Sequence, residues 1–317
     1  MSKEIKVGLI GCGGISKAHL AGYKENKIDV AAVTDANKEA AEKMRAEIPG
    51  SKAFDDFKSM IDSGIVNAVS ICTPPSAHEE AVVYALRKNI NVLCEKPFAD
   101  TVEAAKRISE EAAKSKAVLM LAFRHRYLPA MVKIHDMIAA GEIGAPVFFN
   151  NIFCGPAFGM KDRWFTKKKI AGGGSIFDTS SHSVDLFRYL IGEVVEQKGV
   201  MHTHFEGTDV EDAGIITVKA ANGTVGSMTS AFVAGTGKAF VDIMGQKGEI
   251  LYDYMEPAKI RKKLTGEKEW TEISVTASSG FANQIVHFKE AIEGKHSVSC
   301  TAKDGLRAVE IIQAVYK

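Results

Sequence analysis

A lysine at one place in the chain and an Asp–His pair at another have the types and spacing needed for acid–base chemistry. Lys96 follows an apolar run and precedes a proline. Partial burial lowers the pKa of an amine, which would suit Lys96 to proton transfer or to stabilising an alkoxide. The alternative interpretation is a solvated lysine at a strand end, because most lysines lie at the protein surface.

Asp178 and His182 are the second candidates, and they follow three glycines at 172–174 that leave the backbone room to approach a ligand. If the segment is helical, four-residue spacing places both side chains on one face. A carboxylate beside an imidazole fixes its tautomer and favours its protonated form. That pairing suits a general base that takes a proton from an alcohol. The alternative is an acid that caps a helix, next to a histidine in the core.

The N-terminal stretch predicts a βαβ unit that binds a dinucleotide. An apolar run at 6–10 is followed at once by Gly11-Cys12-Gly13-Gly14-Ile15-Ser16, and a helical pattern follows at 17–26. Gly11 allows a sharp turn, and Gly13 has no Cβ to keep a pyrophosphate away. The free N–H groups at the start of the helix would face that pyrophosphate. Ser16 replaces the usual third glycine and is still small enough for close packing.

An acidic residue completes this motif. A second apolar run at 28–34 ends on Asp35, where a carboxylate accepts hydrogen bonds from the adenosine ribose. Asp35 would repel a 2′-phosphate, and Ala36 and Asn37 supply no arginine, so the cofactor is expected to be NAD. Lys38 leaves NADP open. A methyltransferase that binds a sulfonium nucleoside is the alternative, because its second strand also ends on an acid.

The elements that must position these residues alternate between apolar runs and helical patterns as far as residue 123, which predicts a parallel sheet covered by helices. Ligands bind at the carboxyl ends of such strands. The residues expected at this edge are Gly11, Gly13, Gly14, Asp35, Thr73, Pro74, Glu95, Lys96 and Arg124. Asn37 and Thr101 are expected N-caps, and Ser76 with Glu79 has the spacing of a capping box.

After residue 123 strands dominate, with Asn222-Gly223 as a strong hairpin signal. Helical patterns occur at 128–140, 180–190, 281–293 and 304–316. We therefore predict an α/β protein: an N-terminal Rossmann domain with a doubly wound parallel sheet (1–123) and a C-terminal α+β domain with a largely antiparallel open sheet (124–317). The last helices are free to pack on the first domain.

Composition restricts the function classes. The 317 residues carry a formal net charge of +1, so no electrostatic argument favours nucleic acid or a membrane surface. The N-terminus has no signal-peptide pattern, and the five cysteines are widely spaced, which favours free thiols in a reducing cytoplasm. His202 and His204 share a strand face but have no third ligand nearby, so no metal site is expected.

The motifs together resemble the glucose–fructose oxidoreductase, inositol dehydrogenase and rhizopine-catabolism (Gfo/Idh/MocA) family of nicotinamide oxidoreductases. The resemblance covers nearly the whole chain. It rests on Gly11 to Ile15, Asp35, Thr73-Pro74-Pro75-Ser76-Ala77-His78, Glu95-Lys96-Pro97, Phe123-Arg124-His125-Arg126-Tyr127, and glycines 172–174 with Asp178, His182 and Asp185.

This resemblance implies hydride transfer between a hydroxyl-bearing carbon, often on a sugar or cyclitol, and the nicotinamide. By position, His182 would be the general acid/base, Asp178 would orient it and bind a substrate hydroxyl, and Lys96 would stabilise the reacting oxygen. Arg124 and His125 would face the nicotinamide and the substrate. Cofactor contacts would also come from Ile15, Thr73, Pro74, His78 and Glu95. The resemblance also implies that the second domain binds substrate and that its open sheet forms the subunit contact of a homodimer or homotetramer.

Two further functions remain open. A relative without activity could bind nucleotide and sugar as a sensor or regulator, although such a protein would be expected to lack Lys96 or His182. Sugar oxidation could also assist another step, such as glycoside cleavage.

Overall fold

The structure is a computed structural model and describes residues 4–161 and 163–317. The chain divides into two compact units. They are Met1–Phe123 with Phe281–Arg307, and Arg124–Gly280 with Ala308–Lys317. The last helix, α11 (Ala302–Ala314), contributes residues to both units.

A six-stranded parallel sheet forms the centre of the first unit, in the order β3-β2-β1-β4-β5-β6. Its strands are β1 Lys6–Ile10, β2 Asp29–Thr34, β3 Lys52–Phe54, β4 Ala68–Ile71, β5 Asn91–Cys94 and β6 Leu119–Leu121. Strands β4 and β6 are buried throughout, as expected where helices cover both faces of a parallel sheet. The predicted Rossmann sheet is confirmed.

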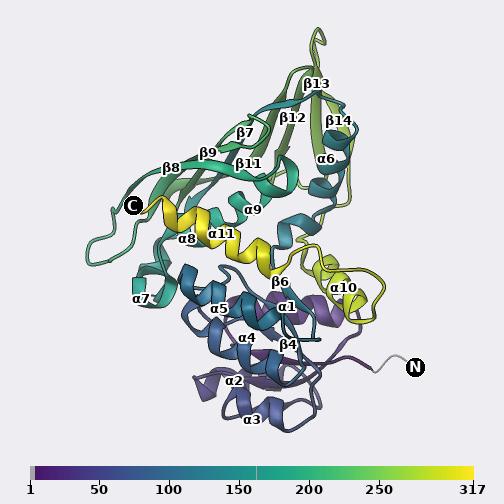
Figure 1. Ribbon diagram of the computed structural model, residues 1–317, viewed down its shortest axis with the longest axis vertical. Helices are drawn as coiled ribbons and strands as arrows, with labels where there is room; N and C mark the ends of the chain where they lie inside the picture. The colour runs from purple at the N-terminus through teal and green to yellow at the C-terminus, as the bar shows by residue number, and fades with distance from the viewer. Residues whose placement is uncertain (1–3, 162) are drawn as a thin grey trace. The chain divides into compact units, whose positions relative to one another are not determined.

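The helices of this unit follow the strands in alternation. They are α1 Gly14–Glu25, α2 Lys38–Ala46, α3 Phe57–Asp62, α4 His78–Arg87, α5 Val102–Ala112 and α10 Phe281–Ile292. Helices α3, α4 and α5 contact one another in a row, and α10 packs on α1 (Figure 1).

Two of these helices have the side-chain caps that the sequence predicts. Asn37 accepts hydrogen bonds from the backbone N–H groups of Glu39 and Ala40, and Thr101 accepts one from Ala104, as predicted. The predicted capping box at Ser76 and Glu79 is wrong. A 3₁₀ turn, η1 (Pro75–Ala77), leads into α4, and the backbone rather than the Ser76 side chain begins the helix.

An eight-stranded sheet forms the second unit, in the order β14-β13-β12-β11-β7-β10-β9-β8. Its strands are β7 Pro146–Pro156, β8 Val194–His202, β9 Ala213–Ala220, β10 Val225–Ala231, β11 Val233–Gly245, β12 Gly248–Asp253, β13 Lys259–Leu264 and β14 Thr271–Ser274. Only the β7–β10 pair is parallel within the described sheet. The hairpin turns at Gly223, whose φ is +91°.

Short helices cover one face of this sheet. The helical elements are η2 Arg124–Tyr127, α6 Pro129–Ala139, η3 Phe158–Met160, η4 Trp164–Thr166, α7 Lys168–Ala171, α8 Ser175–Asp178 and α9 Ser180–Leu190. Helix α9 packs on β7 and β10, and α8 packs on β9 and β10. Alternate residues of the strands, including Val195, Val200 and Val225, are exposed on the opposite face.

Within residues 4–161 and 163–317, every helix is too short or too polar to cross a lipid bilayer. In the same residues, no cluster of three or more His, Cys, Asp or Glu side chains is placed to hold a metal ion.

Candidate active site

The turn after β1 has the geometry of a phosphate-binding loop. Gly11 has φ of +91°, and a Cβ there would lie 2.8 Å from the backbone of Cys72, so only glycine fits. Gly13 and Gly14 differ, because no described heavy atom lies within 4 Å of the Cβ positions built on them. This space would accommodate a pyrophosphate. Ser16 is fully buried and donates a hydrogen bond to the Gly13 carbonyl, so it takes the third glycine's place in the packing.

Helix α1 begins at Gly14, with Gly13 as its N-cap, and no side chain of the described residues caps it. Its first N–H groups therefore remain available to an anion. The Asp35 carboxylate fixes the geometry of the adjoining loops. One oxygen accepts from Cys12 N at 2.7 Å and the other from Asn37 N at 2.7 Å. Each oxygen keeps a second lone pair for a ribose hydroxyl.

The loop after β4 contributes a second feature. The Thr73 Oγ1 atom is buried and has no hydrogen-bond partner among the described residues, which a polar ligand atom would supply. His78 is fully buried, and its ring nitrogens lie 2.9 Å from the Thr73 carbonyl oxygen and 3.0 Å from the Pro97 carbonyl oxygen. It therefore joins the loop after β4 to the loop after β5.

A buried polar network lies beneath Lys96. His19 on α1 places Nε2 2.8 Å from Glu95 Oε1 and Nδ1 3.2 Å from Ser70 Oγ, which in turn lies 2.6 Å from the Tyr23 hydroxyl. Burial lowers the pKa of His19, but Cys72 and Glu95 raise it to about 10. Burial likewise raises the pKa of Glu95, but His19 and Lys96 bring it below its ordinary value.

Glu95 connects this network to Lys96. Its second oxygen accepts a hydrogen bond from the Lys96 backbone N–H at 3.1 Å, and the Lys96–Pro97 peptide bond is cis. The Lys96 side chain is half-buried. Because all six strands are parallel, Gly11, Asp35, Thr73 and Lys96 follow strands that end at the same edge of the sheet.

In the second unit two histidines lie together. The rings of His125 on η2 and His182 on α9 have centroids 4.3 Å apart. The Tyr254 hydroxyl lies 2.8 Å from His125 Nδ1, and the Phe153 ring packs against the edge of the same imidazole. Burial raises the pKa of Tyr254 well above its ordinary value, so its phenol stays protonated at neutral pH.

A buried ion pair holds these two elements in place. The Arg126 guanidinium donates to both oxygens of Asp185, with distances of 2.9 and 2.5 Å. Both side chains are buried, at 8% and 0% exposure. Arg126 follows His125, and Asp185 lies one helical turn after His182, so this bidentate pair fixes one histidine against the other.

The segment that carries Asp178 and His182 is helical, which is the condition for their side chains to lie on one face. Helix α8 ends at Asp178, Thr179 keeps right-handed helical dihedrals, and α9 begins at Ser180. Four-residue spacing in this conformation puts the two side chains on one face. Ser180 anchors the segment to the sheet, because its hydroxyl donates to the Ser230 hydroxyl on β10 at 3.0 Å.

The preceding glycines serve a different purpose from the one predicted. A Cβ at Gly174 would overlap the Glu211 carbonyl oxygen, and a Cβ at Gly173 would overlap the Tyr316 hydroxyl and contact Phe177. The space beside these two glycines is therefore occupied by other residues of the protein. The expectation that all three glycines make room for a ligand is wrong. Gly172 has φ of +85° and ends α7.

Sequence reasoning missed His19, Tyr254, Glu211 and Tyr316 as residues that support the site. His19 carried a weak signal, since it lies on the helix after the glycine motif. The other three are separated from their partners by at least 37 residues, and no local pattern marks them.

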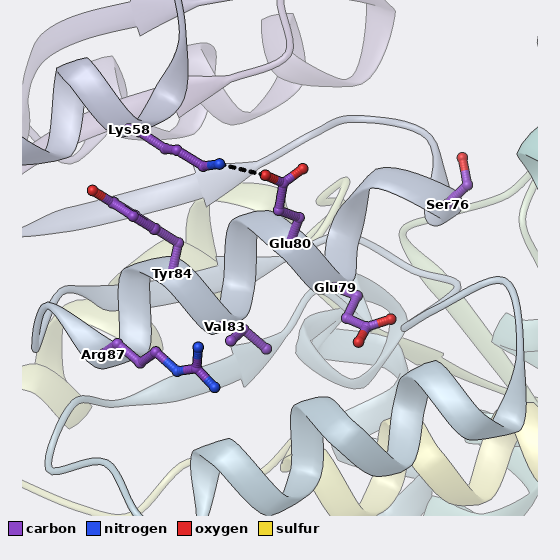
Figure 2. A pocket seen from close by; sticks show the side chains of 7 residues that line it. All are labelled: Lys58, Ser76, Glu79, Glu80, Val83, Tyr84 and Arg87. Atoms are coloured by element: carbon purple, nitrogen blue, oxygen red, sulfur yellow. Dashed lines mark ion pairs between the residues drawn. The ribbon is translucent and has the colours of Figure 1, made fainter.

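A surface pocket of about 410 Å³ lies on the first unit along α4 (Figure 2). Lys58 pairs with Glu80 at 2.6 Å, Arg107 holds Glu79, and Glu111 holds Arg87. Because these charges are neutralised within the protein, we assign no ligand to this pocket. Its lining residues are Lys58, Ser76, Glu79, Glu80, Val83, Tyr84 and Arg87.

Comparison with known proteins identifies the family of this chain. Residues 5–123 match the oxidoreductase family with an NAD-binding Rossmann fold, and residues 131–251 match the Gfo/Idh/MocA C-terminal domain. Inositol 2-dehydrogenase of Rubrobacter xylanophilus is 29% identical over an alignment of 272 residues, and the match covers 82% of this chain and 75% of the relative. Levoglucosan dehydrogenase of Pseudarthrobacter phenanthrenivorans is 27% identical, over 80% of this chain and 74% of the relative.

Solved structures show the same fold. Levoglucosan dehydrogenase in complex with NADH and levoglucosan superimposes with a TM-score of 0.93 at 25% identity, covering 99% of this chain and 96% of that one. The glycine-rich turn, the open space beside Gly13 and Gly14, and the buried Thr73 hydroxyl fit the cofactor of this family. The chain therefore belongs to the Gfo/Idh/MocA family and is a nicotinamide-dependent oxidoreductase with an NAD-binding Rossmann domain.

Proposed function

We propose that this enzyme transfers hydride between NAD and a hydroxyl-bearing carbon of a sugar, cyclitol or related polyol. The observation that carries the proposal is the arrangement around His182 on α9, which lies beside His125 of η2 and one turn after Asp178 of α8. Relatives named inositol and levoglucosan dehydrogenase support the substrate class, because both names denote polyhydroxylated rings.

Each residue has a separate task in the proposed reaction. His182 accepts the hydroxyl proton of the alcohol as general base and returns it when the reaction runs as a reduction. Asp178 orients His182 and binds a neighbouring hydroxyl. The Lys96 ammonium hydrogen-bonds the reacting oxygen and stabilises the negative charge that develops there. His125, held by Tyr254, binds substrate.

NAD, when bound, supplies the nicotinamide carbon that exchanges hydride with the substrate. The residues proposed to hold it are Gly11, Gly13, Gly14, Ile15, Asp35, Thr73, Pro74, His78, Glu95, Lys96 and Arg124. We assign Gly13 and Gly14 to the pyrophosphate and Asp35 to the ribose. The contacts of His78 favour an indirect role, in which it holds the Thr73 loop. NADP remains open through Lys38.

We also propose a homodimer or homotetramer formed through the uncovered face of the eight-stranded sheet. The exposed side chains Val195, Val200 and Met244 support this role. The molar mass from size-exclusion chromatography with light scattering tests this proposal, and a monomer mass would contradict it. The reducing cytoplasm stays a prediction that rests on the five free cysteines.

A polyol panel tests the activity. Purified enzyme with NAD is mixed in turn with myo-inositol, levoglucosan, glucose and other cyclic polyols, and NADH absorbance is followed. We expect turnover with at least one of them. NAD binding by calorimetry without turnover on any of these alcohols would contradict a dehydrogenase and favour a sensor.

A further inference from the structure

A buried carboxylate lies at the start of the helical segment that carries Asp178 and His182. Glu211, which is 5% exposed, precedes β9. Its side-chain oxygens accept hydrogen bonds from Gly174 N at 3.0 Å and Ile176 N at 2.8 Å, and its backbone carbonyl accepts one from Ser175 N at 3.0 Å. One residue thus satisfies three successive N–H groups at the beginning of α8.

A tyrosine hydroxyl forms a further hydrogen bond to this carboxylate. The Tyr316 hydroxyl donates to Glu211 Oε1 at 2.8 Å. Burial raises the pKa of the Glu211 carboxyl, while the bonds from Tyr316 and from the Gly174 and Ile176 N–H groups oppose that rise. Glycine at 174 is required for this contact, because any side chain there would overlap the Glu211 carbonyl oxygen.

The contacts of Glu211 fix the direction of the helical segment that carries Asp178 and His182. Asp178 lies two residues after Ile176, and Asp178 N bonds Gly174 O at 2.8 Å, so the first turn sets the axis of the segment. Helical backbone continues through Thr179 to His182. A shift of the first turn would therefore be carried to both side chains, and small displacements at a reacting centre reduce catalysis strongly.

We propose that Glu211, braced by Tyr316, is a positioning residue that sets the orientation of Asp178 and His182. The inference rests on the proposed function in so far as it names these two side chains as catalytic. Neither Glu211 nor Tyr316 touches substrate in this proposal. Their effect reaches the reaction only through the first turn of α8.

Two variants and a matched control test this inference. Glu211→Gln keeps the size of the side chain but offers one acceptor oxygen in place of two, and Tyr316→Phe removes only the hydroxyl. Glu206→Gln makes the same chemical change at an exposed residue of the preceding loop. The readouts are kcat, the polyol KM, the NAD Kd and the imidazole NMR resonance of His182, assigned by its loss in His182→Gln.

We expect Glu211→Gln to lower kcat about 10- to 100-fold, which corresponds to 1.4 to 2.8 kcal/mol at tenfold per 1.4 kcal/mol, and to shift the His182 resonance. Tyr316→Phe should change both in the same direction by a smaller factor. The NAD Kd should stay within twofold, and Glu206→Gln should match the wild type. If Glu211→Gln fails to fold, Tyr316→Phe carries the test.

Wild-type kcat and an unchanged His182 resonance in folded Glu211→Gln or Tyr316→Phe would overturn the inference and leave the proposed function intact. If the wild type itself oxidises no polyol, the proposed function fails. In that case the His182 resonance still tests the positioning role. A shifted resonance in the variants supports this role, and an unshifted resonance contradicts it.

Discussion

At the scale of single residues, Asp35 is the residue that we propose to select NAD over NADP. Its two oxygens already organise the loops around Cys12 and Asn37, and its charge opposes a 2′-phosphate. We expect Asp35→Ser to raise the KM for NAD roughly 10- to 100-fold, the value of a hydrogen bond to a charged group. The KM for NADP should fall at the same time.

Initial rates with each cofactor at a fixed polyol concentration measure this change. Asp29→Asn, an exposed acid at the start of β2, is the control and should behave as wild type. An unchanged NAD to NADP ratio in Asp35→Ser would show that Asp35 does not contact the ribose.

Tyr254 is the second residue whose role can be isolated. Its hydroxyl lies 2.8 Å from His125 Nδ1 and fixes the direction of that ring. Tyr254→Phe keeps the aromatic packing with Phe153 and removes only this bond. We expect the polyol KM to rise roughly 3- to 10-fold, as for loss of one hydrogen bond, with a smaller change in kcat. A polyol KM equal to that of the wild type would contradict the proposed role of His125 in substrate binding.

At the scale of elements, the His19–Glu95 pair ties helix α1 to the end of strand β5. Removing one partner of a buried ion pair leaves the other charge uncompensated, and this costs about 3–5 kcal/mol. His19→Gln should therefore lower the melting temperature clearly at neutral pH, while Lys17→Gln, on the exposed side of α1, should have little effect.

The pH dependence of this difference follows from the direction of the shift. The folded pKa of His19, about 10, lies above its ordinary value of 6.5. The stability that protonated His19 gains from Cys72 and Glu95 is therefore fully present below pH 6.5 and is lost as the pH rises through 10. Thermal melts from pH 6 to 10 should show the gap between wild type and His19→Gln closing. A gap that stays constant over this range would mean that His19 is neutral in the fold.

Strands β11 and β12 carry a pH-sensitive pair of their own. Burial and the neighbouring Glu249 raise the pKa of Asp242 to about 7. When the pKa of an acid is raised in the folded state, that acid destabilises the protein as the pH rises from the acid's ordinary pKa through its folded pKa. Asp242→Asn should therefore stabilise the protein above pH 7 by about 1–2 kcal/mol, after allowance for solvent screening, and have no such effect at pH 4. Equal melting shifts at both pH values would contradict the assignment.

At the scale of the whole molecule, much of the fold could be predicted because its signals are local. The turn at Gly11, the caps at Asn37 and Thr101 and the hairpin at Gly223 each depend on neighbouring residues, and each is confirmed. The strand-end rule then placed Lys96 at the carboxyl edge of the parallel sheet.

What could not be predicted depends on contacts between distant parts of the chain. Glu211 is 37 residues from Gly174, and Tyr316 is 105 residues from Glu211, so no spacing pattern connects them. The glycines at 173 and 174 were visible in the sequence, but their partners were not. The partner of His19 was hidden for the same reason, since Glu95 is 76 residues away.

The measurement that tests the central claim most directly is NADH formation by Lys96→Ala and His182→Gln beside the wild type, with NAD affinity measured by calorimetry on the same samples. Loss of the proton acceptor or of the group that stabilises the reacting oxygen should lower kcat roughly 10²- to 10⁴-fold. His182→Gln should keep the wild-type NAD Kd, and Lys96→Ala should change it only slightly. Turnover in either variant equal to that of the wild type would contradict the roles assigned to these residues.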